Sequence, residues 1–481
     1  MEHLDVLVIG AGLSGVGAGA YLQDKCPWAN YAVFEARDAI GGTWDLFRYP
    51  GIRSDSDMFT LGYSFRPWDG EKSIADGPSI LRYIEDTARE TGVDKHIRFN
   101  HKIVAADWSS ADGHWRVKAH RADTNETFEL TASFVFSCTG YYRYDDGYTP
   151  DFPGRDRFTG TVIHPQHWPE DLDYTGKKIV VIGSGATAVT LIPSLTDKAA
   201  HVTMLQRSPT YVVSLPAKDP LANALRRTLP SSLSSPIIRW IKALTTQASY
   251  FASKRWPDLV KGIIVRQVKR QLPAGYDVER HFTPRYNPWD QRLCVVPNGD
   301  LFKAISAGKA SVVTDTIATF DETGITLDSG EHLDADIIVT ATGLDLLFLG
   351  GVRLSVDGDE VHPHDKLTYK GMMLEGVPNL AFAIGYSNAS WTLKCDLTCD
   401  YVTRLLNHLH HEGLTSCTPE ASDAGQSTSS VFGLNSGYIN RAADRLPRQG
   451  ASFPWQVKHS YVADYRAMKM KPIVDEEMVF A

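Results

Sequence analysis

One local pattern occurs twice in this chain of 481 residues, and it constrains the fold more than any other feature. In each copy, a run of β-branched and other apolar residues leads through closely spaced glycines into a stretch of small residues. The copies are Leu4–Gly15 and Lys178–Ala188. A continuous apolar run of this kind is typical of a buried parallel strand, and the small residues after the glycines are typical of a closely packed helix. The repeat therefore predicts two separate α/β units.

Each copy overlaps an 18-residue stretch that has no charged side chain and is long enough to cross a membrane; the stretches are Val6–Gln23 and Ile179–Thr196. Gly and Ser interrupt both stretches at the same spacing, which favours the strand–turn–helix interpretation. The net charge of −8 argues against a nucleic-acid partner, because phosphate binding requires a basic surface. The 6 cysteines are scattered and match neither a disulfide framework nor a metal-site spacing. With no leader segment visible, we expect a cytoplasmic protein without a metal site.

Further strands fit the same plan and place the boundaries. Tyr31–Glu35 and Val202–Gln206 are the expected second strands of the two units. Phe134–Cys138 and Ile337–Thr340 each lead into a Thr-Gly pair, which predicts two crossings between the units. We therefore expect an α/β fold with two Rossmann-like dinucleotide-binding domains of the glutathione-reductase type, with a helical insertion in the second. The predicted parts are 1–146 and 345–481 for the first domain, 147–214 and 285–344 for the second, and 215–284 for the insertion.

The first copy has the spacing Gly-x-Gly-x-x-Gly at a strand–helix junction. The first glycine permits the tight turn, the second lets the backbone approach a pyrophosphate, and the third lets the helix pack on the strand. Glu35 follows at the end of the second strand, where a carboxylate can accept both ribose hydroxyls. A second glycine turn, Gly41–Trp44, favours FAD over a plain NAD site. The residues expected at FAD are Gly10, Gly12, Ser14, Gly15, Glu35, Gly42, Thr43, Trp44, Asp55 and Val104.

The second copy has the form Gly-x-Gly-x-x-Ala, and its second strand ends in Arg207 and Ser208 rather than in an acid. An acid would repel a 2′-phosphate, whereas Arg can pair with it and Ser can donate a hydrogen bond. The pattern predicts NADPH rather than NADH. The alternative is that Arg207 only ends a surface strand. The residues expected at NADPH are Gly183, Ser184, Gly185, Ala186, Thr187, Arg207 and Ser208.

Between the two copies lies the segment Phe158-Thr-Gly160-Thr-Val-Ile-His164-Pro-Gln-His-Trp168-Pro169. It matches FxGxxxHxxxWP, the fingerprint of type I Baeyer–Villiger monooxygenases, whereas related flavin-containing monooxygenases usually end it in Tyr. The chain thus resembles the Baeyer–Villiger family over nearly its whole length. The resemblance is strongest to the subgroup that includes the ethionamide-activating monooxygenase. Other matching segments are Gly42–Asp55, Tyr286–Leu293, Ala341–Gly343 and Gly385–Thr392.

The resemblance implies a reaction. NADPH reduces FAD, O2 adds to give a C4a-peroxyflavin, and one oxygen atom enters a ketone or a thioether or thioamide sulfur. In the family an Arg beside the peroxide stabilises the developing anions, and it maps onto Arg292, with its partner carboxylate on Asp55. Arg keeps its charge in a dry pocket where Lys can lose a proton. Without the resemblance, a surface ion pair would be the simpler interpretation of Arg292.

The remaining matched positions are expected to support this chemistry. His164 lies in the predicted linker, so we expect it and the other fingerprint residues to have a structural or gating role in coupling the domains. Gly385, Asn388 and Thr392 are expected near the flavin ring by resemblance. Two close cysteines, Cys395 and Cys399, are interpreted as small core residues rather than as a redox pair.

The segment Leu215–His281 has 12 Lys or Arg and 4 Asp or Glu, inside an acidic protein. Apolar residues recur in it at helical spacing, so we interpret it as helical. Its basic residues form either a solvated face on packed helices, or a patch that steers NADPH or contacts a membrane from the cytoplasmic side. The stretch Pro419–Ser430, rich in Ser and small residues, is predicted to be a surface loop.

Two other functions stay open at this point. One is a flavin-containing monooxygenase that oxygenates nitrogen or sulfur and has little ketone activity. The other is a non-catalytic flavin-binding sensor or membrane-associated module. Neither the physiological substrate nor the oligomeric state follows from the sequence.

Overall fold

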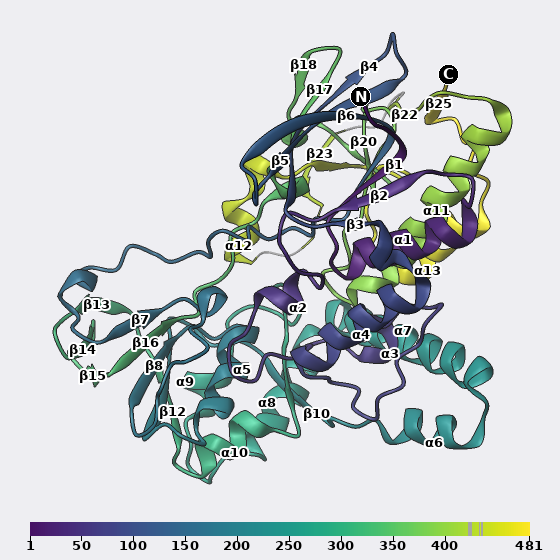
Figure 1. The fold of residues 1–481 in the computed structure, drawn as a ribbon. Coiled ribbons are helices and arrows are strands. Elements are labelled where there is room, and N and C mark those ends of the chain that lie inside the picture. Colours follow the sequence, from purple (N-terminus) through teal and green to yellow (C-terminus); the bar gives the residue numbers. More distant parts are fainter. Residues whose placement is uncertain (422–425, 432, 434–435) are drawn as a thin grey trace.

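The computed structural model describes residues 1–421, 426–431, 433 and 436–481, and two separate sheets organise it (Figure 1). The larger sheet has the order β18-β17-β4-β5-β6-β1-β2-β3, and β21 pairs with β6. Its centre is parallel, whereas β4, β5 and β6 form an antiparallel meander. Its strands are β1 His3–Ile9, β2 Tyr31–Phe34, β3 Ile97–Arg98, β4 His101–Ser109, β5 His114–Arg121, β6 Glu126–Ser137, β17 Arg353–Val356, β18 Asp359–Val361 and β21 Leu380–Phe382.

Helices α1 and α11 lie side by side against this sheet (Figure 1). Strand β1, which is buried from Val6 to Ile9, supplies Val6 and Val8 to a core that also contains Leu22 of α1 and Tyr401 of α11. The apolar run found in the sequence is thus the centre of this unit. The helices of the unit are α1 Leu13–Lys25, α2 Thr43–Leu46, α3 Met58–Leu61, α4 Gly77–Thr91, α11 Trp391–Glu412, α12 Gly437–Arg441 and α13 Tyr461–Asp464.

The second sheet is entirely parallel, in the order β12-β9-β8-β16-β7. Helices α5 and α10 pack against each other beside it, and a small antiparallel sheet, β13-β14-β15, adjoins it. A parallel pair, β10 and β11, is separate from the main sheet. The elements are β7 Thr161–Ile163, β8 Lys178–Ile182, α5 Ala186–Leu195, β9 His201–Gln206, β10 Val212–Leu215, β11 Cys294–Pro297, α10 Asp300–Ser306, β12 Ala310–Thr314, β13 Ile317–Phe320, β14 Gly324–Leu327, β15 His332–Asp334 and β16 Ile337–Thr340.

The predicted fold class is confirmed, because each glycine turn joins a central parallel strand to a helix. The expected second strands are β2 and β9, and the strands expected to lead into the crossings are β6 and β16. The exact domain boundaries stay a prediction.

The two crossings between the units run alongside each other. Leu347 N–H donates to the Tyr141 carbonyl at 3.0 Å, and Tyr148 N–H donates to the Gly343 carbonyl at 3.1 Å. Asp345 of the returning crossing accepts from Arg143 of the outgoing one at 2.7 Å. The crossings therefore form a hydrogen-bonded two-stranded ribbon rather than two independent linkers.

The insertion between β10 and β11 is helical, as predicted, and one of its helices reaches the first unit. Its helices are α6 Pro220–Thr228, α7 Ser231–Arg255, α8 Pro257–Lys269 and α9 Val278–Phe282. Ile238 on α7 packs with Phe59 of α3. Although α7 is long, no helix among the residues described is apolar enough over sufficient length to cross a membrane.

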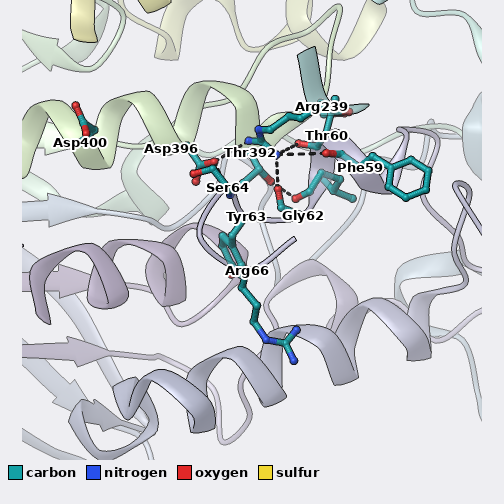
Figure 2. A network of polar contacts seen from close by, with 12 residues as sticks. Phe59, Thr60, Gly62, Tyr63, Ser64, Arg66, Arg239, Thr392, Asp396 and Asp400 are labelled. Carbon is teal, nitrogen blue, oxygen red and sulfur yellow. Dashed lines mark hydrogen bonds and ion pairs between the residues drawn. The ribbon is translucent and has the colours of Figure 1, made fainter. Parts of the chain in front are cut away.

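A buried arginine fastens α7 to the first unit, as Figure 2 shows. The Arg239 guanidinium donates to the carbonyls of Thr60 and Gly62 at 3.2 and 2.6 Å. It also lies 2.6 Å from the Asp396 carboxylate of α11, which in turn accepts from the Ser64 amide at 3.0 Å. A charge that is buried must be paired and hydrogen-bonded, and this one is both.

The C-terminal region differs from the prediction in one place. Part of the predicted loop Pro419–Ser430 is strand β23, Gln426–Ser430, which pairs with β24, Arg448–Gly450. The small polar side chains gave no alternation that would indicate a strand. Residues 422–425 of that stretch lie outside the described residues. Other short strands are β19 Thr368–Tyr369, β20 Met373–Leu374, β22 Cys417–Pro419 and β25 Met478–Phe480.

Removing Arg239 tests whether its ion pair holds the units together. We expect Arg239→Met to cost about 3–5 kcal/mol of unfolding free energy, because Asp396 is then buried without its cation. Lys178→Met removes an exposed ion pair with Asp334 and serves as the control, with an expected cost below about 1 kcal/mol. Urea unfolding followed by tryptophan fluorescence measures both. Equal losses in the two variants would contradict the assignment.

Candidate active site

A cavity with about 860 Å³ of empty space lies where the glycine turns of the first unit meet the second unit. The lining unites residues predicted for FAD with both residues predicted for catalysis. Among them are Gly12, Ser14, Thr43, Trp44, Asp55, Tyr141, Tyr142, Arg292, Tyr386 and Trp391.

The first glycine turn has the close approaches that its sequence predicts. Gly10 has φ +99°, and a Cβ there would lie 2.8 Å from the Cys138 carbonyl oxygen. A Cβ on Gly15 would lie 1.7 Å from the Gly10 carbonyl oxygen, so only glycine allows α1 to pack this closely. The Glu35 carboxylate accepts from the Ala11 amide at 2.7 Å, which fixes the acid beside the turn. This arrangement of amides and carboxylate fits the adenosine diphosphate part of FAD.

Arg292 and Asp55 form the ion pair that was predicted from the resemblance. The Arg292 Nη2 atom lies 3.0 Å from Asp55 Oδ1 and 2.9 Å from Oδ2. The two residues are 237 positions apart in sequence and come from different units. Asp55 raises the pKa of Arg292 above its ordinary value, so this side chain stays cationic.

Local structure presents both members of the pair. Arg292 follows a tight turn in which the Asp290 amide donates to the Asn287 carbonyl at 3.0 Å. Asp55 ends a segment that lies against the second unit, where a Cβ on Gly51 would be 1.8 Å from Ser194 Oγ of α5. Arg53 in the same segment pairs with Asp300 of α10 at 2.5 Å. The segment before Asp55 is therefore held by the second unit, which also contributes Arg292.

Aromatic residues form the wall beside the pair. The sequence interpretation included Trp391 only as part of the matched segment Gly385–Thr392 and named neither Tyr141 nor Tyr142. Trp391 stacks on Tyr141 with a centroid distance of 5.1 Å, and its indole N–H donates to Ser14 Oγ at 2.8 Å. The Tyr141 and Tyr142 hydroxyls lie 2.9 Å apart. Burial raises the pKa of Tyr142 to about 12, so it stays protonated. These residues follow the carboxyl ends of β6 and β21, where parallel sheets bind ligands, and this rule could have found them.

The second glycine turn resembles the first, with Gly183 at φ +135° and its virtual Cβ 2.3 Å from the Ala341 carbonyl oxygen. No atom lies within 4 Å of a Cβ placed on Gly185, so the start of α5 faces open space. The Ser184 hydroxyl hydrogen bonds to Thr210 at 2.7 Å. Arg207 and Ser208 are both exposed at the end of β9. This set fits the diphosphate and 2′-phosphate of NADPH, and the individual contacts stay a prediction.

The fingerprint residues lie around the ribbon and the edge strand β7. His164 Nε2 lies 3.4 Å from the Gly343 carbonyl oxygen, and its Nδ1 accepts from the Gln166 amide at 3.2 Å. Burial lowers the pKa of His164, which favours the neutral ring. Phe158 and Trp168 are buried, and a Cβ on Gly160 would clash with the Asp336 carbonyl oxygen. Like Pro169, which follows Trp168, none of them lines the cavity, which is consistent with a structural role.

Other expected residues lie farther out. Val104 sits at an irregularity in the pairing of β4 with β5 and does not line the cavity. Thr392 directs its hydroxyl to the Leu61 carbonyl at 2.5 Å, and the Asn388 amide donates to the His459 carbonyl at 2.9 Å. Gly385 packs against Trp391. Cys395 and Cys399 are buried free thiols in the core, as interpreted from the sequence.

This geometry defines a protein that binds two dinucleotides on two connected units. A family model described as flavin-binding monooxygenase-like matches residues 73–361, and one for an NAD(P)-binding Rossmann-like domain matches residues 8–67. The FAD-containing monooxygenase EthA of Mycolicibacterium smegmatis is 53% identical over 480 residues, covering 100% of this chain and 97% of the relative. The putative FAD-containing monooxygenase MymA of Mycobacterium tuberculosis is 52% identical, with 100% and 98% covered.

The chain therefore belongs to the flavin-binding monooxygenase-like family, and it groups with the EthA proteins, as the matching segments outside the fingerprint predicted. It is a flavin monooxygenase, and the predicted cofactor pair, FAD with an NADP nucleotide, is confirmed at the level of the family. The fold is shared with an oxidized steroid monooxygenase bound to NADP, at a TM-score of 0.78 and 22% identity over 99% of both chains.

Two glycine substitutions should separate the roles of the turns. We expect Gly15→Ala to abolish retention of FAD, because its methyl group has no room against Gly10. Gly185→Ala meets no protein atom, so the fold and FAD should survive, whereas the KM for NADPH should rise about tenfold. Flavin absorbance of the purified variants and steady-state kinetics measure these effects. An unchanged KM in Gly185→Ala would contradict the second site.

Arg207→Ala tests the choice of nucleotide. Loss of a charged hydrogen-bond partner of the 2′-phosphate should raise the KM for NADPH about ten- to a hundredfold and leave the KM for NADH unchanged. Lys177→Ala is the control, because Lys177 is exposed and directly precedes β8, at the end of the sheet away from Arg207. It should change neither KM. If Arg207→Ala retains the wild-type preference for NADPH, the assignment is wrong.

Proposed function

We propose that this monooxygenase inserts one oxygen atom from O2 into ketones to give esters, and also oxidises thioether and thioamide sulfur, with NADPH as the reductant. The observation that carries the proposal is the Arg292–Asp55 ion pair in the wall of the cavity that contains the first glycine turn. A cation fixed beside the flavin site favours reactions that develop negative charge there.

FAD would lie along Gly10–Glu35 and Gly42–Trp44, and NADPH along Gly183–Ser208. When bound, reduced FAD supplies the activated oxygen. The protein contributes a cation, an aromatic wall and fixed positions. The Asp55 carboxylate holds the guanidinium by two contacts near 3 Å, so little reorganisation is needed as charge develops.

Arg292 suits this task better than Lys would. Its guanidinium stays protonated beside Asp55 throughout the working pH range, and it presents several N–H donors in a plane. An oxyanion that forms on the substrate carbonyl can therefore accept from one nitrogen while another remains on Asp55. The protonated hydroxyls of Tyr141 and Tyr142 lie in the same wall. Oxidation of sulfur needs an electrophilic oxygen and depends less on the cation.

Product analysis of a mixed ketone and sulfide panel tests the proposal. Formation of ester and sulfoxide supports it, whereas sulfoxide alone favours a sulfur- or nitrogen-oxygenating enzyme with little ketone activity. Hydrogen peroxide as the only product over the whole panel would contradict both.

Substitution of Arg292 should separate ester formation from flavin reduction. We expect Arg292→Ala to lower the rate of ester formation about a hundredfold or more, because a charge-stabilising donor is lost. Arg292→Lys should retain part of the rate of ester formation. As pH rises, this rate should fall at a lower pH than in wild type, because an ammonium group can lose its proton. Reduction of FAD by NADPH without O2 is measured separately for each variant.

Arg285→Ala removes an exposed arginine from the same loop and is the matched control, with wild-type rates expected. Equal ester yields from Arg292→Ala and wild type would refute the proposed role of the cation.

A further inference from the structure

Exposed apolar side chains are concentrated on the helical insertion. Among the residues described, 16 large apolar side chains are exposed, and 9 of them lie between Leu215 and Ile263. Seven of these are on α7, α8 and the residue between them, each between 41% and 63% exposed. We call them the α7–α8 stripe: Leu233, Ile237, Leu244, Phe251, Trp256, Leu259 and Ile263.

The spacing of the stripe places its members on one side of each helix. Leu233, Ile237, Leu244 and Phe251 are separated by 4, 7 and 7 residues, which returns to the same side of α7 at 3.6 residues per turn. Leu259 and Ile263 are separated by 4 residues on α8. Trp256, the one residue between the two helices, is exposed where the helices meet. An apolar face of this kind normally faces a core, and here it faces outward.

Charge surrounding the stripe is strongly positive. Residues 220–270 include ten Lys or Arg and one acid, Asp258, whereas the whole chain has 49 basic and 57 acidic residues. Three of the ten, Arg239, Lys242 and Lys254, pair with carboxylates of other segments. Arg255 lies beside the ring of Trp256, at 5.7 Å from its centroid, and Arg266, Lys269 and Arg270 are exposed along α8 and at its end. This combination of apolar residues and cations on helices complements an anionic lipid surface.

The side of α7 away from the stripe is firmly attached to the protein. Ile238 packs on Phe59 of α3, and Arg239 donates to the carbonyls of Thr60 and Gly62 at the end of that helix (Figure 2). Leu61 of α3 lines the cavity. Lys254 at the end of α7 donates to the Trp289 carbonyl at 3.1 Å, within the turn that presents Arg292. The stripe is therefore the outer face of a helix that is held rigidly by its inner face.

We infer that the α7–α8 stripe and its surrounding cations dock this protein on the surface of an anionic membrane. The contact is peripheral: apolar side chains enter the interface, and the basic residues face the acidic headgroups. It is independent of which substrate the cavity oxidises.

Flotation of the FAD-bound protein with lipid vesicles tests this inference. Wild type should bind mixed phosphatidylcholine–phosphatidylglycerol vesicles and should bind pure phosphatidylcholine much less. The triple variant Phe251→Ser, Trp256→Ser, Leu259→Ser should reduce partitioning about tenfold or more. The double variant Arg266→Glu, Arg270→Glu should weaken partitioning onto the mixed vesicles by about fivefold or more for each position. Added salt should likewise weaken the partitioning of wild type.

Val474→Ser and Lys309→Glu change exposed residues elsewhere and should leave vesicle binding unchanged. Retained flavin absorbance shows that each variant is folded. Absence of wild-type binding to the mixed vesicles, or equal binding by the triple variant, overturns the inference. If wild type sediments as a dimer and the triple variant as a monomer, while vesicle binding is unchanged, the stripe contacts a second copy of the chain and the inference is wrong.

Discussion

The ion pair between Arg292 and Asp55 is the contact on which the arrangement of the cavity depends. Each of its charges comes from a different unit, and both side chains are partly buried, with 33% of Arg292 and 27% of Asp55 exposed. To form the pair, the segment before Asp55 must lie on α5, which is possible only because Gly51 has no side chain. Arg53 then pairs with Asp300 a short distance away. One electrostatic contact thus fixes the position of a backbone segment between two sheets.

The same glycine turn occurs in both units, but its surroundings differ. In both glycine turns the first glycine has a left-handed φ and packs against the carbonyl of a neighbouring strand end. Around the first turn, the chain adds a second glycine turn, a carboxylate and an aromatic wall, which enclose a cavity. Around the second, Gly185 and Arg207 remain open to solvent. The same backbone turn therefore lines a cavity in the first unit and faces open solvent in the second.

Most features predicted correctly from the sequence were predicted from patterns among neighbouring residues. The glycine spacings, the apolar strands and the helical insertion depend on neighbouring residues, and all of them are present. Arg292 and Asp55 were paired only through the family resemblance, because nothing local relates residues 237 positions apart. Tyr141 and Tyr142 lack periodic spacing, since they occupy the connection after β6, and Trp391 is the first residue of α11. The strand β23 was missed because its small polar residues resemble a loop and its partner is distant in sequence.

The paired crossings have a mechanical consequence. A two-stranded ribbon joined by backbone hydrogen bonds resists stretching and sliding along its length, but it bends readily out of its plane. Because Arg143 and Asp345 tie the crossings together, bending of this ribbon is the movement that the crossings themselves permit most easily. The ion pairs of Arg292 with Asp55 and of Arg53 with Asp300 also join the two units, so such bending would stretch both pairs.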